Sequence, residues 1–425
     1  MQTPVNKLDK VEFIATPFQK GALSASAKKP KAPFIKGGGD TERIRSVNRG
    51  FAKRILTLIS AITIYILPLA SCTGISVQTE NFFTMDTLGE STIISKSDSI
   101  GKEMNAKIKD ICDEVEGRIS NTIETSEIYK LNDYLKNEAD HTSPFYLSDE
   151  LAGLLNTAKN IKEATSGAYD PNLGEIIDLW DINNPDENAA HKLPEKDDFY
   201  PAVERVNEFQ FSLSENDGGV FYDYNLFYPP KIDLGGIGKG YALDCVSDYL
   251  SRENMQNALV SFGSSILAIG KNKSGKLWTI GIKDPLDTAR ICGYVSATDK
   301  VVSVSGGYER FIDINGIDYC HILDPETGYP VDNDLLCTVV VMNAKSALQT
   351  QDMQEKFKNN GAISDALSTA LYVMGKEKAL KFYSSQDNKL DFEMILFVKS
   401  DSDPKGYEIL STNVIFTELG PLEGY

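Results

Sequence analysis

Cysteine is scarce in this 425-residue chain, and its few copies have no regular spacing. The chain has 6 Cys and no CxxC pair. Zinc sites and disulfide frameworks need closely and regularly spaced cysteines, so the sequence argues against both. Most of these cysteines are expected to be small residues of the core.

Positive charge is also scarce over most of the chain. Residues 1–71 carry 12 Lys/Arg against 4 Asp/Glu, a net charge of +8. The whole chain has a net charge of −18, so residues 72–425 have a net charge of −26. Proteins that bind nucleic acids need clustered Lys and Arg. The acidic body therefore excludes a nucleic acid as partner. A hydrophobic content of 41% is ordinary for a globular protein with a large core.

The basic N-terminal part contains one uncharged apolar stretch, Ile55–Ala70, preceded by five Lys/Arg within 43–54 and followed by Ser71 and Cys72. This order is typical of a secretory signal, and roughly 20 apolar residues would be needed to span a membrane. Leu69–Cys72 (LASC) resembles the bacterial lipobox, whose cysteine is lipidated. The alternative is an uncleaved membrane anchor, and both place the body outside the cytoplasm.

These features predict an extracytoplasmic, membrane-anchored bacterial lipoprotein. We expect a signal peptide over residues 43–72 with Cys72 as the lipidated residue, a tether over 73–84, and one folded domain over 85–425. Residues 1–42 precede the signal, either as a misassigned start or as a disordered leader.

Hydrophobic periodicity predicts a mixture of helices and strands in the body. With no internal repeat and no regular alternation of strand and helix, this mixture favours an α+β fold. Helices are expected at Ile100–Ser120, Asp149–Thr165, Tyr241–Arg252, Ser364–Met374 and Glu377–Ser384. Strands are expected at Thr84–Ser95, Lys231–Leu234, Ala258–Ile269, Trp278–Lys283, Ile291–Ser296, Val301–Ser305, Arg310–Ile314 and Thr338–Met342, with a polar loop at Asn183–Pro201.

The segment Lys231–Tyr241 (KIDLGGIGKGY) carries four glycines between an expected strand and an expected helix. Glycines let backbone N–H groups approach a ligand closely, and a helix N-terminus favours anions. The segment matches neither GxGxxG nor the P-loop. On these grounds phosphate binding and a simple tight turn stay open as alternatives.

Five blocks together resemble the ApbE family of FAD:protein FMN transferases. They are IDLGGIGKGYALD at 232–244, GAYDP at 167–171 with Gly174 and Leu179-Trp180, SGGYER at 305–310, HILDPETGYP at 321–330 and DALSTA at 365–370. They span about residues 80–400 in order. The resemblance implies an α+β, two-lobed fold with FAD in the cleft between the lobes. It also implies FAD contacts from Met85, Ala168, Tyr169, Asp170, Asp233, Lys239 and Leu323.

The resemblance further implies a Mg²⁺ site made by the Gly236 carbonyl, Asp365 and Thr369. Asp365 and Thr369 are four residues apart, so on a helix their oxygens project from one face. Carboxylate, hydroxyl and carbonyl oxygens are donors suited to Mg²⁺. Without the resemblance, both would be read as ordinary helix residues.

One of the three histidines, His321, begins the HILDPETGYP block. Imidazole titrates near neutrality and can take a hydroxyl proton, which makes His321 the candidate catalytic base, although a lone histidine is more often structural. His141 and His191 match no block and are expected on the surface.

The implied reaction transfers FMN from FAD to a Thr or Ser hydroxyl of an acceptor protein and releases AMP. The family's acceptors are flavin-carrying subunits of membrane redox complexes or extracellular electron-transfer proteins. The alternatives are a Mg²⁺-dependent FAD pyrophosphatase, with water as the nucleophile, and a non-catalytic flavin-binding lipoprotein. Two departures from the family pattern stand out: Gly263-Ser264-Ser265 replaces an expected Gly-Gly-Asp, and residues 348–363 look like a surface insertion.

Overall fold

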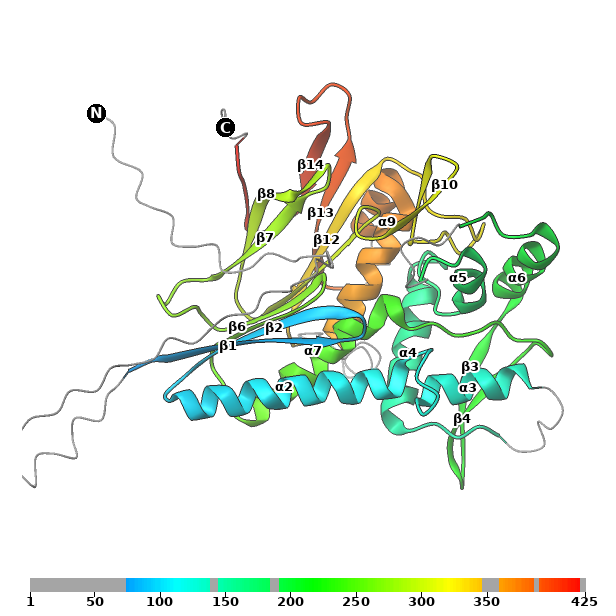
Figure 1. Cartoon of the computed structure of the whole chain (residues 1–425), viewed down its shortest axis with the longest axis horizontal. Coiled ribbons are helices and arrows are strands. Elements are labelled where there is room, and N and C mark those ends of the chain that lie inside the picture. Colours follow the sequence, from blue (N-terminus) through cyan, green and yellow to red (C-terminus); the bar gives the residue numbers. More distant parts are fainter. Residues whose placement is uncertain (1–73, 138–143, 184–190, 346–358, 386–389, 421–425) are drawn as a thin grey trace, which may run out of the picture. The chain divides into compact units, whose positions relative to one another are not determined.

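An eight-stranded antiparallel sheet organises the part of the chain that the structure describes (Figure 1). The computed structural model describes residues 74–137, 144–183, 191–345, 359–385 and 390–420. The predictions for residues 1–72, including Cys72, and for His141 lie outside these residues. In sheet order the strands are β1 (Ser76–Thr84), β2 (Thr87–Ser95), β5 (Ala258–Phe262), β6 (Ser265–Ile269), β9 (Lys300–Gly306), β12 (Leu335–Asn343), β13 (Phe392–Lys399) and β14 (Tyr407–Ser411).

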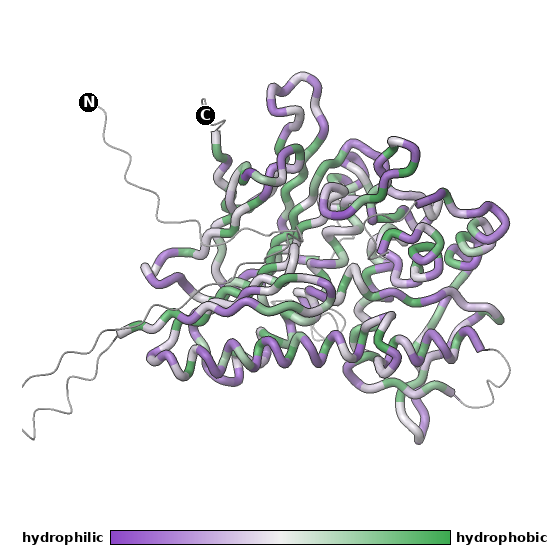
Figure 2. Tube along the Cα trace, in the orientation of Figure 1, coloured by the Kyte–Doolittle hydropathy of each residue, from purple (hydrophilic) through white to green (hydrophobic). Residues whose placement is uncertain are grey.

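Both faces of this sheet are covered, which explains why its central strands are hydrophobic at consecutive positions. In β12, Val340 joins the core formed with the helices, whereas its neighbour Val339 joins a second core. That second core includes Trp278 of a three-stranded sheet in the order β15-β8-β7. Figure 2 shows the resulting hydrophobic colour along the central strands. The three strands are β7 (Trp278–Asp284), β8 (Asp287–Ala297) and β15 (Phe416–Glu418).

Helices α2 (Asp98–Ile119), α7 (Gly235–Arg252) and α9 (Asn360–Ser384) contribute the helical side of the first core. The amphipathic spacing of α2 buries Met104, Ile108 and Val115 there, whereas α9 is buried almost all round over its first three turns. Also in this part of the fold are α3 (Glu127–Lys136), α4 (Asp149–Ala164) and the hairpin of β3 (Phe211–Asn216) and β4 (Gly219–Tyr224).

A third, smaller core lies among α5 (Gly174–Trp180), α6 (Lys196–Glu208), β10 (Phe311–Ile314) and β11 (Ile317–Cys320). Trp180 is fully buried in it, and its indole N–H donates to the Gly328 carbonyl at 2.9 Å. This bond ties α5 to the loop that follows β11.

The predicted α+β class is confirmed, and most expected elements are present within a few residues of their predicted bounds. The expected strand Ala258–Ile269 is a hairpin, β5 and β6, which turns at Gly263 (φ +61°). The expected break between two C-terminal helices is real, since Gly375 has non-helical angles inside α9.

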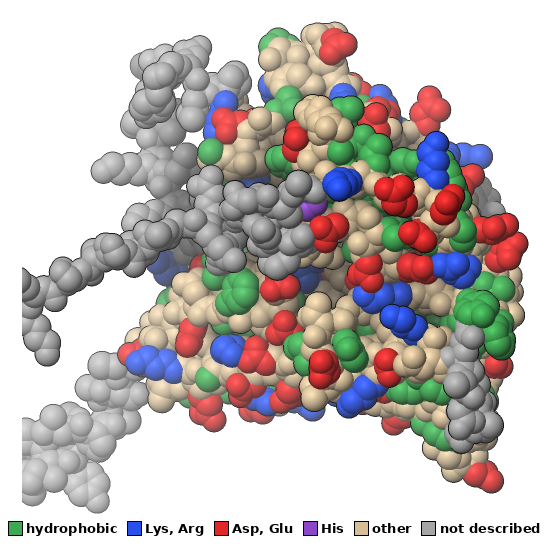
Figure 3. All heavy atoms as spheres, turned by 45° about the vertical axis from the view of Figure 1, so that its right-hand side comes forward, with side chains coloured by type: hydrophobic (Ala, Val, Ile, Leu, Met, Phe, Trp, Pro, Cys, Tyr) green, Lys and Arg blue, Asp and Glu red, His purple; other side chains and the backbone are tan. Residues whose placement is uncertain are grey.

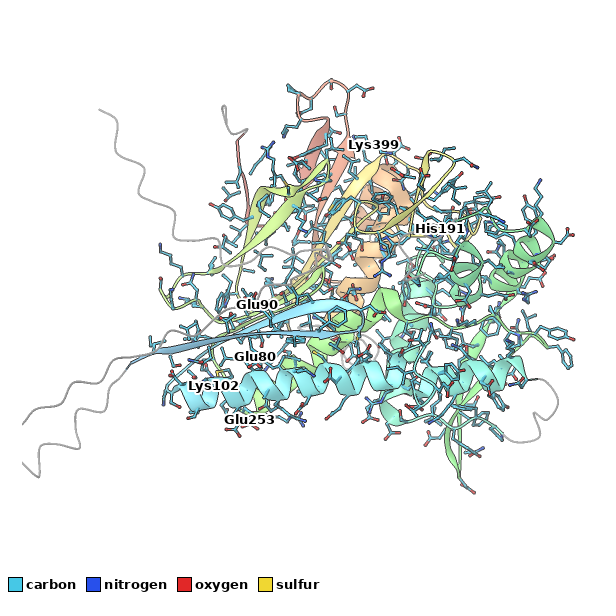
Figure 4. The ribbon with its side chains drawn as sticks, in the orientation of Figure 1. Glu80, Glu90, Lys102, His191, Glu253 and Lys399 are labelled. Atoms are coloured by element: carbon cyan, nitrogen blue, oxygen red, sulfur yellow. The ribbon has the colours of Figure 1, made fainter. Side chains whose placement is uncertain are left out.

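Four expectations are wrong. Residues 76–84 of the expected tether form β1, which pairs along its whole length with β2. Lys231–Leu234 is not a strand, and the expected loop Asn183–Pro201 includes the first turns of α6. Of the expected insertion, residues 360–363 are buried at the start of α9 rather than at the surface, and residues 348–358 are not described. Figure 4 labels Glu80 on β1 and Glu90 on β2, which mark the hairpin that replaces the tether.

Among the described residues, no helix is both long and apolar enough to cross a membrane. The five cysteines of this part of the chain are free thiols. On the face in Figure 3, acidic and basic side chains are interspersed with hydrophobic ones.

Candidate active site

The glycine-rich segment forms the first turns of α7 instead of a loop. The Gly235 N–H donates to Asp233 Oδ1 at 2.7 Å, and the Leu234 carbonyl accepts from the N–H groups of Ile237 and Gly238. The helix therefore begins at Gly235, six residues before its predicted start. Three of its first four N–H groups are thus bonded within the chain, and the Gly236 N–H and the helix dipole remain to favour an anion in front of this end.

The glycines of α7 serve close packing. A Cβ on Gly240 would lie 2.0 Å from the carbonyl oxygen of Gly361, and a Cβ on Gly361 would lie 2.3 Å from that of Gly240. Helices α7 and α9 therefore cross with their backbones in contact, which only glycine permits. The crossing places Asp365 and Thr369 of α9 beside the first turns of α7. A Cβ on Gly236 would lie 4.0 Å from Thr369 Oγ1.

Asp365 is the buried carboxylate of this crossing, with 3% of its surface exposed. Its Oδ2 accepts the Gly240 N–H at 3.0 Å and lies 3.9 Å from Lys239 Nζ. Its Oδ1 accepts the Ser265 hydroxyl at 3.1 Å. The Gly240 N–H is the group that would pair with the Gly236 carbonyl in a regular helix, so Asp365 and Gly236 meet at one point of the helix.

Hydroxyl groups continue from Asp365 along α9. Thr369 Oγ1 lies 3.2 Å from Ser305 Oγ, which in turn lies 2.7 Å from Ser368 Oγ. Ser368 donates back to the Asp365 carbonyl at 2.8 Å. These neutral hydroxyls, together with one carboxylate, make an oxygen-rich site at the end of β9.

Asp244, the last residue of the IDLGGIGKGYALD block, fixes the start of α9. Its two carboxylate oxygens accept the N–H groups of Gly361 and Ala362 at 2.7 and 2.8 Å. Burial raises its pKa to about 7, against the lowering effect of these two hydrogen bonds. Asp244 thus holds the N-terminus of α9, four residues before Asp365, from a neighbouring helix.

The departure Gly263-Ser264-Ser265 lies at this site. A Cβ on Gly263 would be 3.3 Å from Lys239 Cδ, so the β5–β6 turn touches the aliphatic part of the lysine. Ser265 places a neutral donor against Asp365, where the family pattern has an acid.

The GAYDP block contributes Tyr169, whose ring edge borders Gly236: Tyr169 Cε2 is 3.4 Å from the position of a Cβ on that glycine. Asp170 does not face the crossing. Its Oδ2 pairs with Lys162 at 2.6 Å, and its Oδ1 accepts two N–H groups of Asn172. Burial raises the pKa of Asp170, against the effect of Lys162.

Three other predicted FAD contacts occupy different settings. Asp233 accepts from Asn121 Nδ2 at 2.7 Å as well as from Gly235. Met85 occupies the β1–β2 turn with φ of +48°, and Met85 and Ala168 both pack on the first core. Leu323 is 4% exposed within the third core.

His321 lies within electrostatic reach of Lys239. Its Nδ1 is 3.0 Å from the Arg310 carbonyl oxygen. A carbonyl only accepts, so Nδ1 carries the proton and Nε2 keeps its lone pair. Burial of the imidazole, with the nearby positive charges of Arg310 and Lys239, lowers its pKa to about 4. The ring is neutral at physiological pH and has a free acceptor nitrogen.

Glu309 completes the charges around Lys239. Burial raises its pKa to about 7, while Lys239, Lys283 and Arg310 oppose the rise and Asp365 adds to it. Acidic groups on α9 and on the SGGYER block thus both lie within electrostatic reach of Lys239, whose side chain is 23% exposed.

The structure therefore brings together five predicted site residues, with Asp233 and His321 near them. The five are Gly236, Lys239, Asp365, Thr369 and Tyr169. His191 belongs elsewhere: its imidazole is only 13% exposed and lies 3.8 Å from Asp181, so the prediction of a surface residue is wrong. Sequence reasoning missed Ser265, Ser305 and Asp244. Two of them lie inside recognised blocks, but nothing in the residues themselves indicates their partners.

This fold and site define an α+β protein with an anion-favouring helix end beside a buried cluster of oxygen donors. The ApbE family model matches residues 85–394. The chain belongs to the ApbE family. It is 28% identical over 320 residues to the FAD:protein FMN transferase of Haemophilus influenzae, covering 73% of this chain and 82% of that protein. It is 27% identical over 313 residues to that of Vibrio cholerae, covering 72% and 82%.

Solved structures agree with this assignment. The ApbE protein of Thermotoga maritima superposes with a TM-score of 0.63 at 26% identity, covering 80% of this chain and 97% of that one. The flavin transferase ApbE of Vibrio cholerae gives 0.62 at 23% identity, covering 80% and 98%. The second likeness supports the fold.

Proposed function

We propose that this chain is an FAD:protein FMN transferase, which moves FMN from FAD to an acceptor protein and releases AMP. One observation carries the proposal within an established family: the α7–α9 crossing joins an anion-favouring helix end, a lysine and a buried carboxylate. A diphosphate needs the first two, and a divalent cation needs the third.

The chain's own residues divide the work as follows. The Gly236 N–H at the start of α7, the dipole of this helix and the Lys239 ammonium bind the diphosphate of FAD and hold it in front of the helix. The acceptor's hydroxyl oxygen attacks the phosphorus of the FMN half. An O–P bond forms while the bond to the AMP oxygen breaks, and AMP leaves with that electron pair.

His321 is the proposed base for the attacking hydroxyl. The geometry leaves Nε2 unprotonated, and this nitrogen takes the proton as the new O–P bond forms. Acceptors with a Thr or Ser hydroxyl fit this role. Asp324, three residues on, is the alternative base.

The residues at the crossing fit a Mg²⁺ ion. The proposed donors are the Asp365 carboxylate, the Thr369 hydroxyl and the Gly236 carbonyl, all of them oxygens. Among the described residues no group of three or more His, Cys, Asp or Glu side chains could hold a metal. Such a sparse protein donor set suits Mg²⁺, which keeps waters and substrate phosphates as its other ligands. When bound, the ion would neutralise charge on the diphosphate.

We also propose that the enzyme acts outside the cytoplasm, attached to a membrane through lipid on Cys72, and that its FAD lies in a cleft between two lobes. The LASC sequence after a basic and apolar stretch supports the first part. The separate third core around Trp180 supports the second.

One incubation tests the function. The purified chain is mixed with FAD, Mg²⁺ and a flavin-accepting subunit of a membrane redox complex, and both AMP and protein-bound flavin are followed. Equal amounts of the two are expected. AMP without bound flavin would show the pyrophosphatase instead. Bound FAD without any AMP would leave a flavin-binding lipoprotein.

A further inference from the structure

Two buried phenol groups in the described structure have no hydrogen-bond partner, those of Tyr169 and Tyr222. Their side chains are 4% and 3% exposed. A buried hydroxyl without a partner is costly, because it has given up its bonds to water. Such a group in a ligand site therefore indicates that the ligand supplies the missing partner.

The two phenols differ in their surroundings. Tyr169 borders Gly236 in the first turn of α7, and its phenol lies within electrostatic reach of Asp233, Asp365 and Asp170. Tyr222 belongs to the β3–β4 hairpin and stacks on Phe211 with ring centroids 4.9 Å apart. Asp170 influences its phenol too, but Asp233 and Asp365 do not. Both residues thus have an unpartnered phenol hydroxyl, but that of Tyr169 lies at the proposed site and that of Tyr222 lies outside it.

The Tyr169 hydroxyl remains protonated at any physiological pH, since burial and the neighbouring carboxylates raise its pKa well above its usual value. It is therefore a donor. Its ring borders Gly236, in the turn of α7 that precedes Lys239, so the group that completes its bonding is an anionic oxygen placed there.

We propose that the Tyr169 hydroxyl donates a hydrogen bond to a diphosphate oxygen of the bound dinucleotide, so that this tyrosine binds substrate through its oxygen as well as its ring. The inference rests on the proposed function, because it takes FAD as the dinucleotide. It assigns Tyr169 a part in recognising phosphate that a phenylalanine at this position would lack.

The test compares Tyr169→Phe with Tyr222→Phe and the wild-type chain, with dissociation constants measured for FAD, ADP and riboflavin with and without Mg²⁺. A hydrogen bond to a charged group is worth about ten- to a hundredfold in affinity. Tyr169→Phe should weaken FAD and ADP by that factor, with and without the metal, and should leave riboflavin unchanged. Tyr222→Phe should change none of the three.

Thermal unfolding without ligand provides a second measurement. Because the Tyr169 hydroxyl has no partner in the ligand-free protein, Tyr169→Phe should melt no lower than the wild type. A lower melting temperature together with equal weakening of riboflavin and FAD would overturn the proposal, since the hydroxyl would then shape the pocket. Unchanged FAD affinity, or weakening confined to Mg²⁺-containing samples, would also overturn it. Wild-type protein that binds no FAD would instead overturn the proposed function itself.

Discussion

At the scale of single residues, the site depends on how buried charges are partnered. Asp365 and Asp170 are both buried carboxylates of recognised blocks, yet their oxygens are used differently. One carboxylate oxygen of Asp170 pairs with Lys162, and the other accepts from Asn172. Asp365 instead accepts two neutral donors, and the Lys239 ammonium lies 3.9 Å from it. Of the two, Asp365 therefore has the capacity to bind a further cation.

Replacement of Asp365 should therefore affect metal-dependent activity more than replacement of Thr369. We expect Asp365→Ala to lower FMN transfer by more than about a hundredfold and Thr369→Ala by less, because the first removes a charged donor and the second a neutral one. EDTA should abolish turnover in the wild type. Initial rates over a Mg²⁺ titration check this. Wild-type rates from Asp365→Ala at limiting Mg²⁺ would refute the assignment.

The pH dependence of the rate should report His321. Its pKa of about 4 means that the base form predominates at neutral pH and is lost as pH falls through the acidic range. The rate should therefore rise with pH and level off below neutrality. Bound anionic substrate should raise the apparent pKa of this rise. His321→Ala should lose about 10²–10⁴-fold at saturating FAD and lack this rise.

The control is Asp324→Asn, assayed beside His321→Ala at saturating FAD. If Asp324→Asn proves the slower enzyme, the carboxylate is the base. If His321→Ala raises the FAD dissociation constant but keeps the wild-type rate, the imidazole only shapes the pocket.

At the scale of secondary-structure elements, the amphipathic pattern predicted α2 and α4 closely, because burial of one face decides their positions. The start of α7 was not predictable in this way. Glycine has poor helix propensity, so four glycines indicated a loop. In the structure they lie in a helix, and one of them, Gly240, packs against Gly361 of α9. The edge strand β1 was missed for a related reason: most of its side chains are not buried, and its polar pattern is typical of a linker.

The helix crossing itself can be tested with one methyl group. Gly240→Ala would place a Cβ 2.0 Å from a backbone oxygen of α9, which cannot move without shifting Asp365. We expect a loss of about 3 kcal/mol in the free energy of unfolding and a large loss of activity. Urea denaturation measures the first.

Gly117→Ala in α2 is the matched control, since a Cβ there meets no atom within 4 Å. It should stabilise the protein by about 0.5–1 kcal/mol, as alanine is the better helix former. Equal stability of the two variants would contradict the close crossing.

At the scale of the whole molecule, the recognised blocks located the site because the fold gathers them at α7, α9 and the end of β9. Hydroxyl and carboxylate partners such as Ser265, Ser305 and Asp244 escaped prediction, since their roles depend on contacts between residues far apart in sequence. Local patterns carry no information about such contacts.

The proposed anchor is tested on whole cells. Cys72→Ser should release the body from the membrane fraction or leave an uncleaved precursor, because no lipid can then be attached. Fractionation and mass spectrometry of the mature N-terminus measure this in the native host. Mature protein with an unmodified Cys72 would show that the lipoprotein proposal is wrong.

The replacement of the expected tether by β1 changes where such an enzyme can work. With β1 starting at Ser76, three residues separate it from Cys72, and an extended chain of that length reaches about 14 Å. A lipid on Cys72 would therefore hold the catalytic body close to the bilayer surface. The body could not then diffuse away from the membrane. Acceptors that share the membrane would meet it by two-dimensional diffusion at a high effective concentration, whereas free soluble proteins would have to approach a surface already crowded by lipid headgroups.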